Sequence, residues 1–377
     1  MAQGNLQKFE FGFPVRVFFG NGLLDETGRI VSAFGPKKVL IVAGGSMERL
    51  GCVGRTRESL GGIESVLFDG IAGEPTLAVC DEAAAFARKE KVDAVIGLGG
   101  GSVLDTAKAA AMLAVNSGRA ADYTEKKDFA KKGLPFIAIP STSGSGSEVT
   151  RASVFKNPET HEKAVIRSGN SFPAAAIVDP LLTLSCPPRV TAESGMDAMT
   201  HAVEAFVSSA ASPITDDFAL RAVRLANASL EPAVAKGKNV RARHGMSLAS
   251  LLAGMAISNA GTGACHAFAH SIGGKFDVPH GRINAIMLPH VMQLNLSARR
   301  EKFSILAKAL GENSAEAGIK KVRRLAKSVG IKETLKDFNI TKADFSAIAD
   351  GCFSGTIKRN PKMVSKRELL GVLEKAL

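Results

Sequence analysis

The chain has 377 residues, of which 45% are hydrophobic, with 38 glycines and 15 prolines. This composition is that of a globular protein and excludes a disordered or collagen-like chain, while the length favours two domains over one. The net charge is +12, but basic residues alternate with acids, and the chain has one tyrosine and no tryptophan. Nucleic-acid surfaces combine basic patches with stacking aromatics, so we expect no nucleic-acid partner, whereas anionic cofactors and substrates suit this charge.

The cysteines and the apolar stretches bear on the compartment. The five cysteines lie far apart without a C-x-x-C pair: Cys52, Cys80, Cys186, Cys265 and Cys352. This spacing argues against a disulfide framework and a zinc knuckle, and it favours reduced thiols. The start, MAQGNLQKFEF, has no apolar segment of the signal-peptide kind, and the longest apolar stretch, residues 247–258, is too short to span a bilayer. We therefore predict a cytoplasmic protein with no membrane partner.

Short apolar runs alternate with helical patterns in the first half. The runs ending in glycine or proline are 37–45, 93–101, 134–147 and 174–180, and the helical patterns between them include 77–91 and 105–115. Strands that are apolar throughout and separated by helices predict a parallel sheet covered on both faces.

Beyond about residue 183 the strand patterns stop. Successive amphipathic segments at 191–210, 215–230, 240–260 and 314–330 predict helices. The predicted architecture is an α/β dinucleotide-binding domain with a parallel sheet, residues 1–183, followed by an all-helical metal-binding and substrate domain, residues 184–377. The cleft between them is the expected site.

Two glycine- and hydroxyl-rich loops follow predicted strands. In GLGGGSVLDTAK, residues 97–108, glycines 99–101 allow close backbone approach to a phosphate at a helix N-terminus. Ser102 stands where G-x-G-x-x-G has its third glycine, so this loop alone could equally be an ordinary strand–helix turn. The second loop, PSTSGSGSEVT at 140–150, offers hydroxyls for a ribose phosphate. Two such loops at strand ends favour dinucleotide binding.

The turn after the first predicted strand bears on the type of cofactor. NAD enzymes usually place a carboxylate on the adenosine ribose at such a strand end. Here the strand runs into Gly44, Gly45 and Ser46, with Arg49 close behind and no acid. This leaves room for a 2′-phosphate and favours NADP over NAD, although a simple tight turn would have the same sequence.

Histidines cluster in a way that predicts a metal site. Asp197 and His201 are four residues apart, as are His266 and His270, and His280 stands between a proline and a glycine in an expected loop. One such pair alone could be hydrogen-bonded within a helix, but burying all five without a cation would cost several kcal/mol. Nitrogen and oxygen donors together suit Zn²⁺ or Fe²⁺. His161, His244 and His290 have no such neighbours and are treated as ordinary residues.

Four motifs together resemble the iron-containing (group III) alcohol dehydrogenase family, which has a dehydroquinate synthase-like fold. They are GGGSVLDTAK, PSTSGSGSEVT, GMDAMTHAVEA and the H-x-x-x-H…PHG segment, and the likeness runs from FPVRVFFGNG to KRNPK. The resemblance implies a metal held by Asp197, His201, His266 and His280, with His270 as a non-ligand histidine near the substrate. The cofactor contacts that it implies, together with the NADP turn, are Gly44, Gly45, Ser46, Gly99, Gly100, Gly101, Ser102, Asp105, Ser141, Thr142, Ser145, Lys163 and Leu182.

The resemblance implies an NAD(P)-dependent oxidoreductase that interconverts a small primary alcohol and its aldehyde. The metal, Fe²⁺ or Zn²⁺, would act as a Lewis acid on the substrate oxygen, and His270 would pass a proton to solvent. Family habit implies a homo-oligomer, a dimer. The alternatives are a metal- and NAD-dependent lyase, for which Arg151 is the one evident phosphate-binding residue, and a reductase of hydroxy-acid or phosphonate aldehydes. A nicotinamide-binding sensor without catalysis is a further alternative, and the identity of the alcohol or aldehyde stays open.

Overall fold

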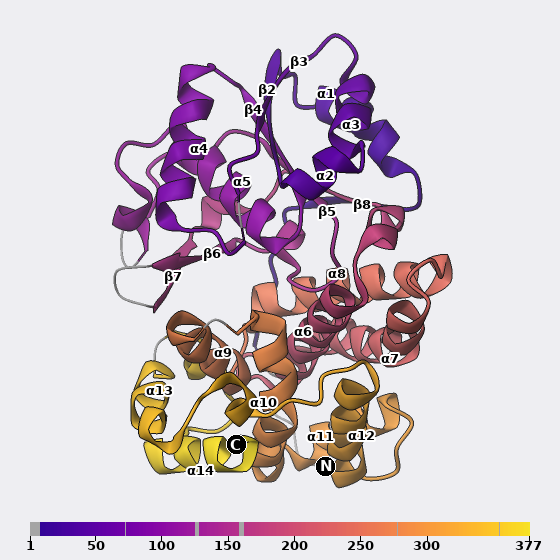
Figure 1. The fold of residues 1–377 in the computed structure, drawn as a ribbon, viewed down its shortest axis with the longest axis vertical. Coiled ribbons are helices and arrows are strands. Elements are labelled where there is room, and N and C mark those ends of the chain that lie inside the picture. Colours follow the sequence, from indigo (N-terminus) through magenta and orange to yellow (C-terminus); the bar gives the residue numbers. More distant parts are fainter. Residues whose placement is uncertain (1–7, 72, 125–127, 158–161, 277, 354) are drawn as a thin grey trace.

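The computed structural model describes residues 8–377 except 72, 125–127, 158–161, 277 and 354. Within these residues an α/β part is followed by a helical part, and the two lie end to end (Figure 1). The predicted fold class is confirmed. None of the described helices alone is long and apolar enough to cross a membrane; α8 and α9 together meet the length and composition, but they are bent by 99°.

The central sheet has six parallel strands in the order β1-β8-β5-β4-β2-β3, and a separate antiparallel hairpin is formed by β6 and β7. The strands are β1 (Arg16–Phe19), β2 (Lys38–Ala43), β3 (Glu64–Phe68), β4 (Ala94–Gly99), β5 (Phe136–Pro140), β6 (Ala152–Asn157), β7 (Glu162–Arg167) and β8 (Ala175–Val178). The four predicted strands are β2, β4, β5 and β8. The sequence prediction missed the other four, of which β1 and β3 are the edge strands of the sheet.

Alternation along β2 explains why the sheet is covered on both faces. Val39 and Ile41 pack with α1 and α3, whereas Leu40 and Val42 pack with α4 and α5. The helices of this part are α1 (Thr27–Ser32), α2 (Gly45–Arg49), α3 (Cys52–Leu60), α4 (Leu77–Lys89) and α5 (Gly101–Leu113). Helix α5 begins four residues before the predicted 105–115, because Gly100 with extended backbone is its N-cap and Gly101 is already helical.

The helical part packs around α6, which contacts α7, α8 and α10. Its helices are α6 (Pro188–Val207), α7 (Pro213–Ala235), α8 (Val240–Ala260), α9 (Ala264–Lys275), α10 (His280–Asn295), α11 (Arg300–Ala309), α12 (Ala315–Ser328), α13 (Phe345–Gly351) and α14 (Lys366–Ala376). Local sequence sets the ends: Ser212 caps α7 ahead of Pro213, and Pro188 opens α6. The predicted domain boundary at 183/184 falls between β8 and α6 and stays a prediction.

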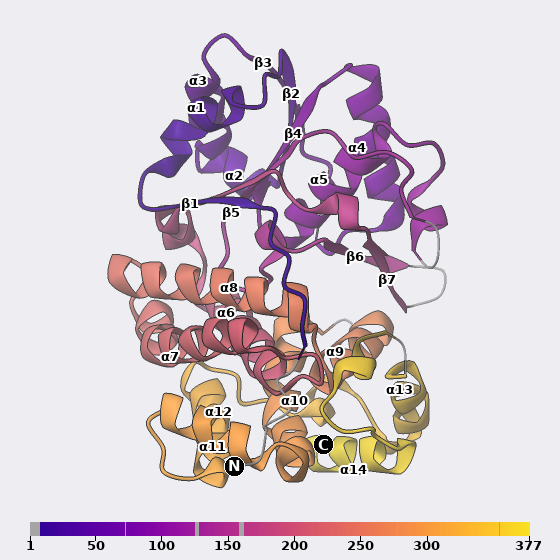
Figure 2. The same cartoon turned by 180° about the vertical axis from the view of Figure 1, so that it is seen from behind.

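Two segments tie the halves together. Residues 8–15 run along the helical part before entering β1 (Figure 2), and Gly12 exchanges two hydrogen bonds with the Asn259 side chain of α8. On the other side, β7 packs against α9. Because β2, β4 and β5 are parallel, the loops that follow them leave the sheet at the same end, which faces the helical part (Figure 1).

Candidate active site

The predicted metal ligands come from three helices. Asp197 and His201 lie one turn apart on α6, His266 lies on α9, and His280 is the first residue of α10. The prediction that His280 occupies a loop is therefore wrong: Pro279 caps α10 with extended backbone, and the helix begins at the histidine itself.

The donor atoms converge. One atom each from Asp197, His201 and His266 lies within 4.8 Å of the other two, and all three residues are buried. The Asp197 Oδ1 atom is 3.6 Å from His266 Nε2 and 3.7 Å from His280 Nε2. His280 stands outside the most compact group, and its side chain is 30% exposed. The sequence prediction that these four residues meet is consistent with this geometry.

Two of the imidazoles are oriented by other groups. His266 Nδ1 lies 2.6 Å from Glu204 Oε2, and His201 Nδ1 lies 3.2 Å from the Gly144 carbonyl oxygen. These contacts leave the Nε2 atoms of both rings free to bind a cation, as second-shell carboxylates and carbonyls do in metal sites. Sequence reasoning missed Glu204, although its position three residues after His201 places it on the same side of α6.

Asn284 is a further missed residue, and it is fully buried. Its Nδ2 atom donates to Asp197 Oδ1 at 2.7 Å and lies 3.3 Å and 3.2 Å from the Nε2 atoms of His266 and His280. Its Oδ1 atom has no hydrogen-bond partner. The spacing of four residues from His280, one turn of α10, could have identified it.

This donor set fits a divalent ion. A carboxylate that is 6% exposed is faced by imidazoles and an amide and by no lysine or arginine among its hydrogen-bond and ion-pair partners in the described chain. A cation at the point where the carboxylate and imidazoles converge would offset the cost of burying them. One oxygen and three nitrogens are donors that Fe²⁺ and Zn²⁺ accept, whereas Mg²⁺ and Ca²⁺ prefer oxygen alone.

The pKa values of the residues in the cluster shift in opposite directions. Burial acts to raise the pKa of the Asp197 carboxyl, but His201, His266 and His280 together hold it below its usual range. Burial lowers the pKa of His280 to about 3, against the opposing effect of Asp197. Burial also acts to lower the pKa of His266, but Glu204 and Asp197 outweigh it and raise it to about 9. The protonation of each of these residues therefore depends on the others.

His270 lies one turn after His266 on α9. Its ring centroid is 6.3 Å from that of His266 and 5.6 Å from that of His280. Burial lowers the pKa of His270 well below its ordinary value, and electrostatic interactions with His280, His266, Lys163 and Arg167 lower it further. This imidazole is therefore uncharged at neutral pH.

The two predicted phosphate loops lie directly against each other. Gly99 ends β4, Gly100 caps α5, and the Ser141 amide donates to the Gly99 carbonyl at 2.8 Å. A Cβ atom on Gly101 would lie 3.0 Å from the Ser145 side chain, so any larger residue would push the two loops slightly apart. Thr142 and Ser145 are half-exposed beside Ser102, whereas Ser141 is buried. The exposed hydroxyls and amides thus form one surface.

The same second loop also touches the metal cluster. A Cβ atom on Gly144 would lie 2.6 Å from Ser194 of α6, and the Gly144 carbonyl oxygen contacts His201. The loop therefore connects the predicted cofactor surface to a predicted metal ligand.

Asp105 belongs to a buried polar group beneath this loop. Its carboxylate accepts hydrogen bonds from the Ser147 hydroxyl at 2.5 Å and the Val154 amide at 2.8 Å. Lys108 lies 3.8 Å from Asp105 and donates to Ser147 and to the Ala152 carbonyl. The Asp105 carboxylate is thus bound by protein groups and connects α5 to the 140–150 loop; its role as a cofactor contact stays a prediction.

The remaining predicted cofactor residues lie in separate surroundings. Gly44 caps α2, Gly45 begins it, and a Cβ atom on Gly45 would lie 3.2 Å from Arg49 Nη1, so this guanidinium lies over the turn beside exposed Ser46. Lys163 forms an ion pair with Glu74 at the α9 side of β7. Leu182 is buried in the core of the sheet. As cofactor contacts, all of these stay predictions.

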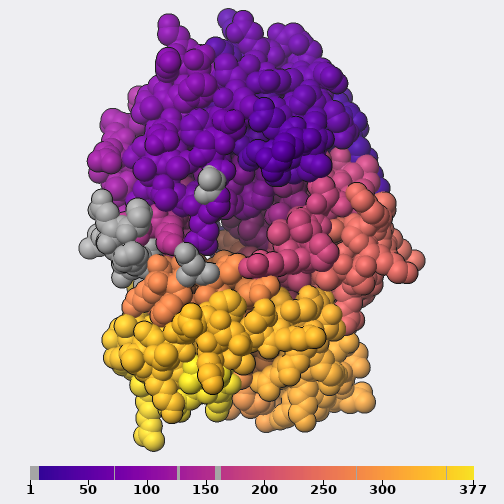
Figure 3. All heavy atoms as spheres, in the orientation of Figure 1, coloured from indigo at the N-terminus to yellow at the C-terminus, as the bar shows by residue number. Residues whose placement is uncertain are grey.

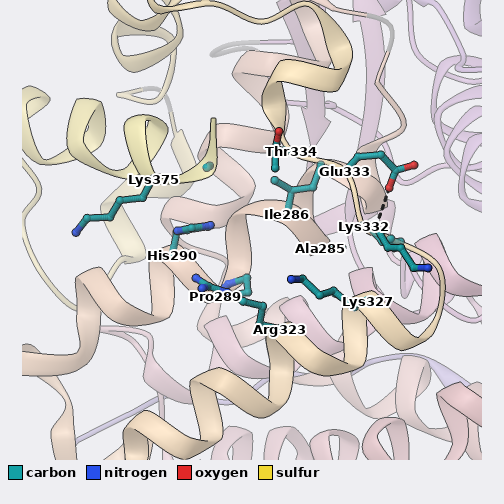
Figure 4. A pocket seen from close by; sticks show the side chains of 13 residues that line it. Ala285, Ile286, Pro289, His290, Arg323, Lys327, Lys332, Glu333, Thr334 and Lys375 are labelled. Carbon is teal, nitrogen blue, oxygen red and sulfur yellow. Dashed lines mark hydrogen bonds between the residues drawn. The ribbon is translucent and has the colours of Figure 1, made fainter.

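A recess separates the α/β part from the helical part in the space-filling view (Figure 3), where the cleft was expected. Another cavity, of about 220 Å³, lies between α10, α12 and α14 (Figure 4). Helical spacing places its lining residues Ile286 and Pro289 on the side of α10 opposite His280 and Asn284. Arg323, Lys327, Lys332 and Lys375 surround it, and burial together with Arg323 and Lys375 lowers the pKa of His290 to about 4.

The other two histidines can be placed in part. His244 packs edge-on against Phe19 with ring centroids 4.9 Å apart, and no described contact joins it to the cluster. His161 lies outside the described residues. All five cysteines are free thiols, as expected from their spacing.

Family models match both parts of the chain. Residues 14–180 match the model described as iron-containing alcohol dehydrogenase, and residues 191–377 match that of the C-terminal part of the Fe-containing alcohol dehydrogenase family. The 1,3-propanediol dehydrogenase of Klebsiella pneumoniae is 38% identical over 98% of both chains. Alcohol dehydrogenase 4 of Saccharomyces cerevisiae (strain YJM789) is 35% identical, with 97% of this chain and 98% of the relative covered.

Solved structures share the whole fold. A 1,3-propanediol oxidoreductase structure superposes with a TM-score of 0.93 at 37% identity, covering 98% of this chain and 100% of the other. A sulfoacetaldehyde reductase from Bifidobacterium kashiwanohense in complex with NAD⁺ has a TM-score of 0.93 at 31% identity, covering 98% and 99%.

Proposed function

The chain belongs to the iron-containing alcohol dehydrogenase family, and we propose that Asp197, His201, His266 and His280 hold its divalent metal ion. The protein is an oxidoreductase acting on alcohols and aldehydes. The observation that supports the ligand set is the convergence of one carboxylate oxygen and the imidazoles at a buried point, with no lysine or arginine among the described partners of the carboxylate.

Each residue around this point has a proposed task. A bound Fe²⁺ or Zn²⁺ would supply a Lewis acid for the substrate oxygen. Glu204 and the Gly144 carbonyl orient His266 and His201, and the Asn284 amide holds Asp197 Oδ1. His270 would exchange the proton of the substrate hydroxyl with solvent, because its ring lies beside those of the proposed ligands His266 and His280.

The test of this function uses chelated protein reloaded with Fe²⁺ or Zn²⁺. A panel of small aldehydes with NADH and NADPH is followed at the nicotinamide absorbance, and metal content is measured in the same samples. We expect turnover only in reloaded protein and stoichiometric consumption of the nicotinamide. Turnover in fully chelated protein would contradict the role of the ligand set, and the ratio of rates with the two ions would decide between them.

For the cofactor we propose the paired loops at Gly99–Ser102 and Ser141–Ser145 as the pyrophosphate and nicotinamide surface, with NADP preferred over NAD. The support for NADP is the absence of an acid at Gly44 and the Arg49 guanidinium over the same turn. A carboxylate at this position would accept hydrogen bonds from the ribose hydroxyls of NAD, whereas an arginine would bind the 2′-phosphate of NADP. Lys163 and Leu182 lie apart from these loops and are the less direct contacts of the proposal.

The Gly44→Asp variant tests this preference. We expect the ratio of kcat/KM for NADPH over NADH to fall about a hundredfold, because the new carboxylate repels the 2′-phosphate. Gly62→Asp is the matched control, since a Cβ atom there would meet no neighbouring atom within 4 Å. An unchanged ratio in Gly44→Asp would refute the assignment of this turn to the adenosine ribose.

We also propose that the substrate is a small primary alcohol or aldehyde and that the enzyme is a cytoplasmic homodimer with a domain boundary near residues 183/184. The free thiols support a reducing compartment. Light scattering coupled to gel filtration would test the dimer, and the calibrated mass of a monomer would contradict it.

A further inference from the structure

Three arginines surround α9, the helix that carries His266 and His270. Arg167 ends β7, and the strand register pairs it with Ala152, so Arg151 is its immediate neighbour across the hairpin. Because β7 packs against α9, both lie on the same side of that helix. Arg359 ends the 3₁₀ turn Gly355–Arg359, which also packs against α9.

Arg359 is fixed at the N-terminal end of α9. A Cβ atom on Gly261 would lie 2.9 Å from Arg359 Cγ, and the next residue, Asn360, accepts a hydrogen bond from the Ala264 amide that begins the helix. The Arg359 carbonyl oxygen accepts a hydrogen bond from the Ser209 amide. Arg359 therefore packs against Gly261, and its neighbour Asn360 is hydrogen-bonded to the first residue of the helix that carries the predicted ligand His266.

In the part of the chain that the structure describes, no anionic side chain pairs with these arginines. Among the described residues, none of the three guanidiniums takes part in a hydrogen bond or an ion pair, and all three residues are exposed to solvent. Nearby Lys163, by contrast, is paired with Glu74. Like charges brought together without a counter-ion repel one another, so an anionic ligand would relieve the repulsion.

The electrostatics agree with this placement. Arg167 is exposed, but neighbouring protein atoms withdraw part of its guanidinium from water and lower its pKa, and the charges of Arg151 and Arg359 lower it further. Arg167 and Lys163 in turn contribute to the lowered pKa of His270. The three arginines and His270 are therefore linked by electrostatic interactions: Arg151 and Arg359 act on Arg167, and Arg167 acts on His270.

From this arrangement we propose that the substrate is a small aldehyde whose far end carries an anionic group, a sulfonate, phosphonate or carboxylate, bound by Arg151, Arg167 and Arg359. The inference rests on the proposed function and specifies the substrate class of the same site. The aldehyde carbon receives a hydride and its oxygen a proton, giving the alcohol, while the reduced nicotinamide becomes oxidised. Guanidinium groups suit such oxyanions because they can donate two parallel hydrogen bonds.

The test compares aldehydes of similar size in metal-loaded enzyme. The anionic substrates are sulfoacetaldehyde, phosphonoacetaldehyde and succinic semialdehyde, one for each of the three head groups. Propanal is the neutral reference. We expect at least one anionic aldehyde to exceed propanal in kcat/KM by about a hundredfold or more. In Arg167→Gln and Arg151→Gln this selectivity ratio should fall about 10–100-fold.

Arg323→Gln is the matched control, because it removes an equally exposed arginine at the separate basic cavity behind α10. It should leave the selectivity ratio unchanged. No preference for any anionic aldehyde, or an equal loss in Arg323→Gln, would overturn the proposal.

A binding measurement separates this inference from the proposed function. Calorimetry with ethanesulfonate, at constant ionic strength and on metal-free protein, should show saturable binding that Arg167→Gln weakens at least tenfold. If no aldehyde is turned over but this binding is observed, the proposed chemistry fails and the anion site stands. If propanal is reduced but ethanesulfonate does not bind, the anion site fails and the chemistry stands.

Discussion

Two buried polar clusters, one in each half of the chain, contact the 140–150 loop, and they differ in one component. In the α/β half, Asp105, Ser147 and Glu148 are grouped around Lys108, which is 1% exposed and supplies a cation. In the helical half, Asp197, Glu204 and the histidines converge with no lysine or arginine among their described partners.

This difference indicates which cluster needs a ligand. A buried carboxylate needs a compensating positive charge, and a cluster that contains its own cation can be complete as protein alone. The first cluster therefore holds the 140–150 loop to α5. In the second, His266, whose pKa is raised, is the one group that can offset the two carboxylates of Asp197 and Glu204 among their described partners, and a cation from solution would complete it. If this comparison is right, damage to the first should be seen in folding stability and damage to the second in metal binding and turnover.

The largest effect is expected from His266→Ala. Loss of a ligand removes the Lewis acid, which contributes several kcal/mol to the transition state, so kcat should fall about a thousandfold or more. Bound metal, measured by mass spectrometry, should fall in parallel, and added Fe²⁺ or Zn²⁺ should no longer raise Tm. His244→Ala is the control histidine, and a variant that retained both metal and turnover would exclude His266 from the site.

In the other cluster, Lys108→Met should act on stability. Asp105 and Glu148 would remain buried without their cation, which costs about 3–5 kcal/mol in the free energy of unfolding. Urea titration measures this loss, and Lys89→Met, on the exposed face of α4, should change it by less than about 0.5 kcal/mol. The folded fraction should still bind metal; a variant of normal stability that lost its metal would reverse the comparison.

The sequence revealed the parts of these clusters that are local. Asp197 and His201 are one helical turn apart, and β2, β4 and β5 are continuous apolar runs, so both the ligand pair and the central strands could be recognised from spacing alone. Edge strand β3 was not predicted from the sequence because it is only partly buried and has no long apolar run.

Contacts between distant segments could not be predicted in this way. Arg167 and Arg359 meet at α9 only because a hairpin and a C-terminal 3₁₀ turn both pack there, 192 residues apart in the chain. Glu204 and Asn284 were within reach by helical spacing, but nothing local indicates that one faces His266 and the other Asp197. His280 was misplaced because the proline before it is as common in loops as before a helix.

A smaller effect is expected where a group acts through a ligand. Glu204→Gln keeps the shape of the side chain but removes the charge that orients His266, so metal affinity should fall about 10–100-fold. Competition with a chromogenic chelator measures this, and exposed Glu231→Gln on α7 is the control. Unchanged affinity would mean that the 2.6 Å contact between Glu204 and His266 serves the fold alone.

The smallest effect is a pH dependence carried by the self-contained cluster. Burial raises the pKa of Glu148 from 4.5 to about 7, so between these values the folded state keeps a proton that the unfolded state has released, and the free energy of unfolding falls as pH rises. Burial lowers the pKa of Lys108 from 10.5 to about 8, so between pH 8 and 10.5 the unfolded state holds the extra proton and stability rises again.

These two opposing slopes predict a shallow minimum of stability near pH 7–8, with limbs of about 1–3 kcal/mol. Glu148→Gln should remove the acid limb and leave the alkaline one. Taking the difference between wild type and variant in urea titrations at each pH cancels the histidines of the metal cluster, which titrate in the same range. An identical pH profile in Glu148→Gln would mean that Glu148 is ionised throughout, and that the cluster in the α/β half carries a net charge that Lys108 does not offset.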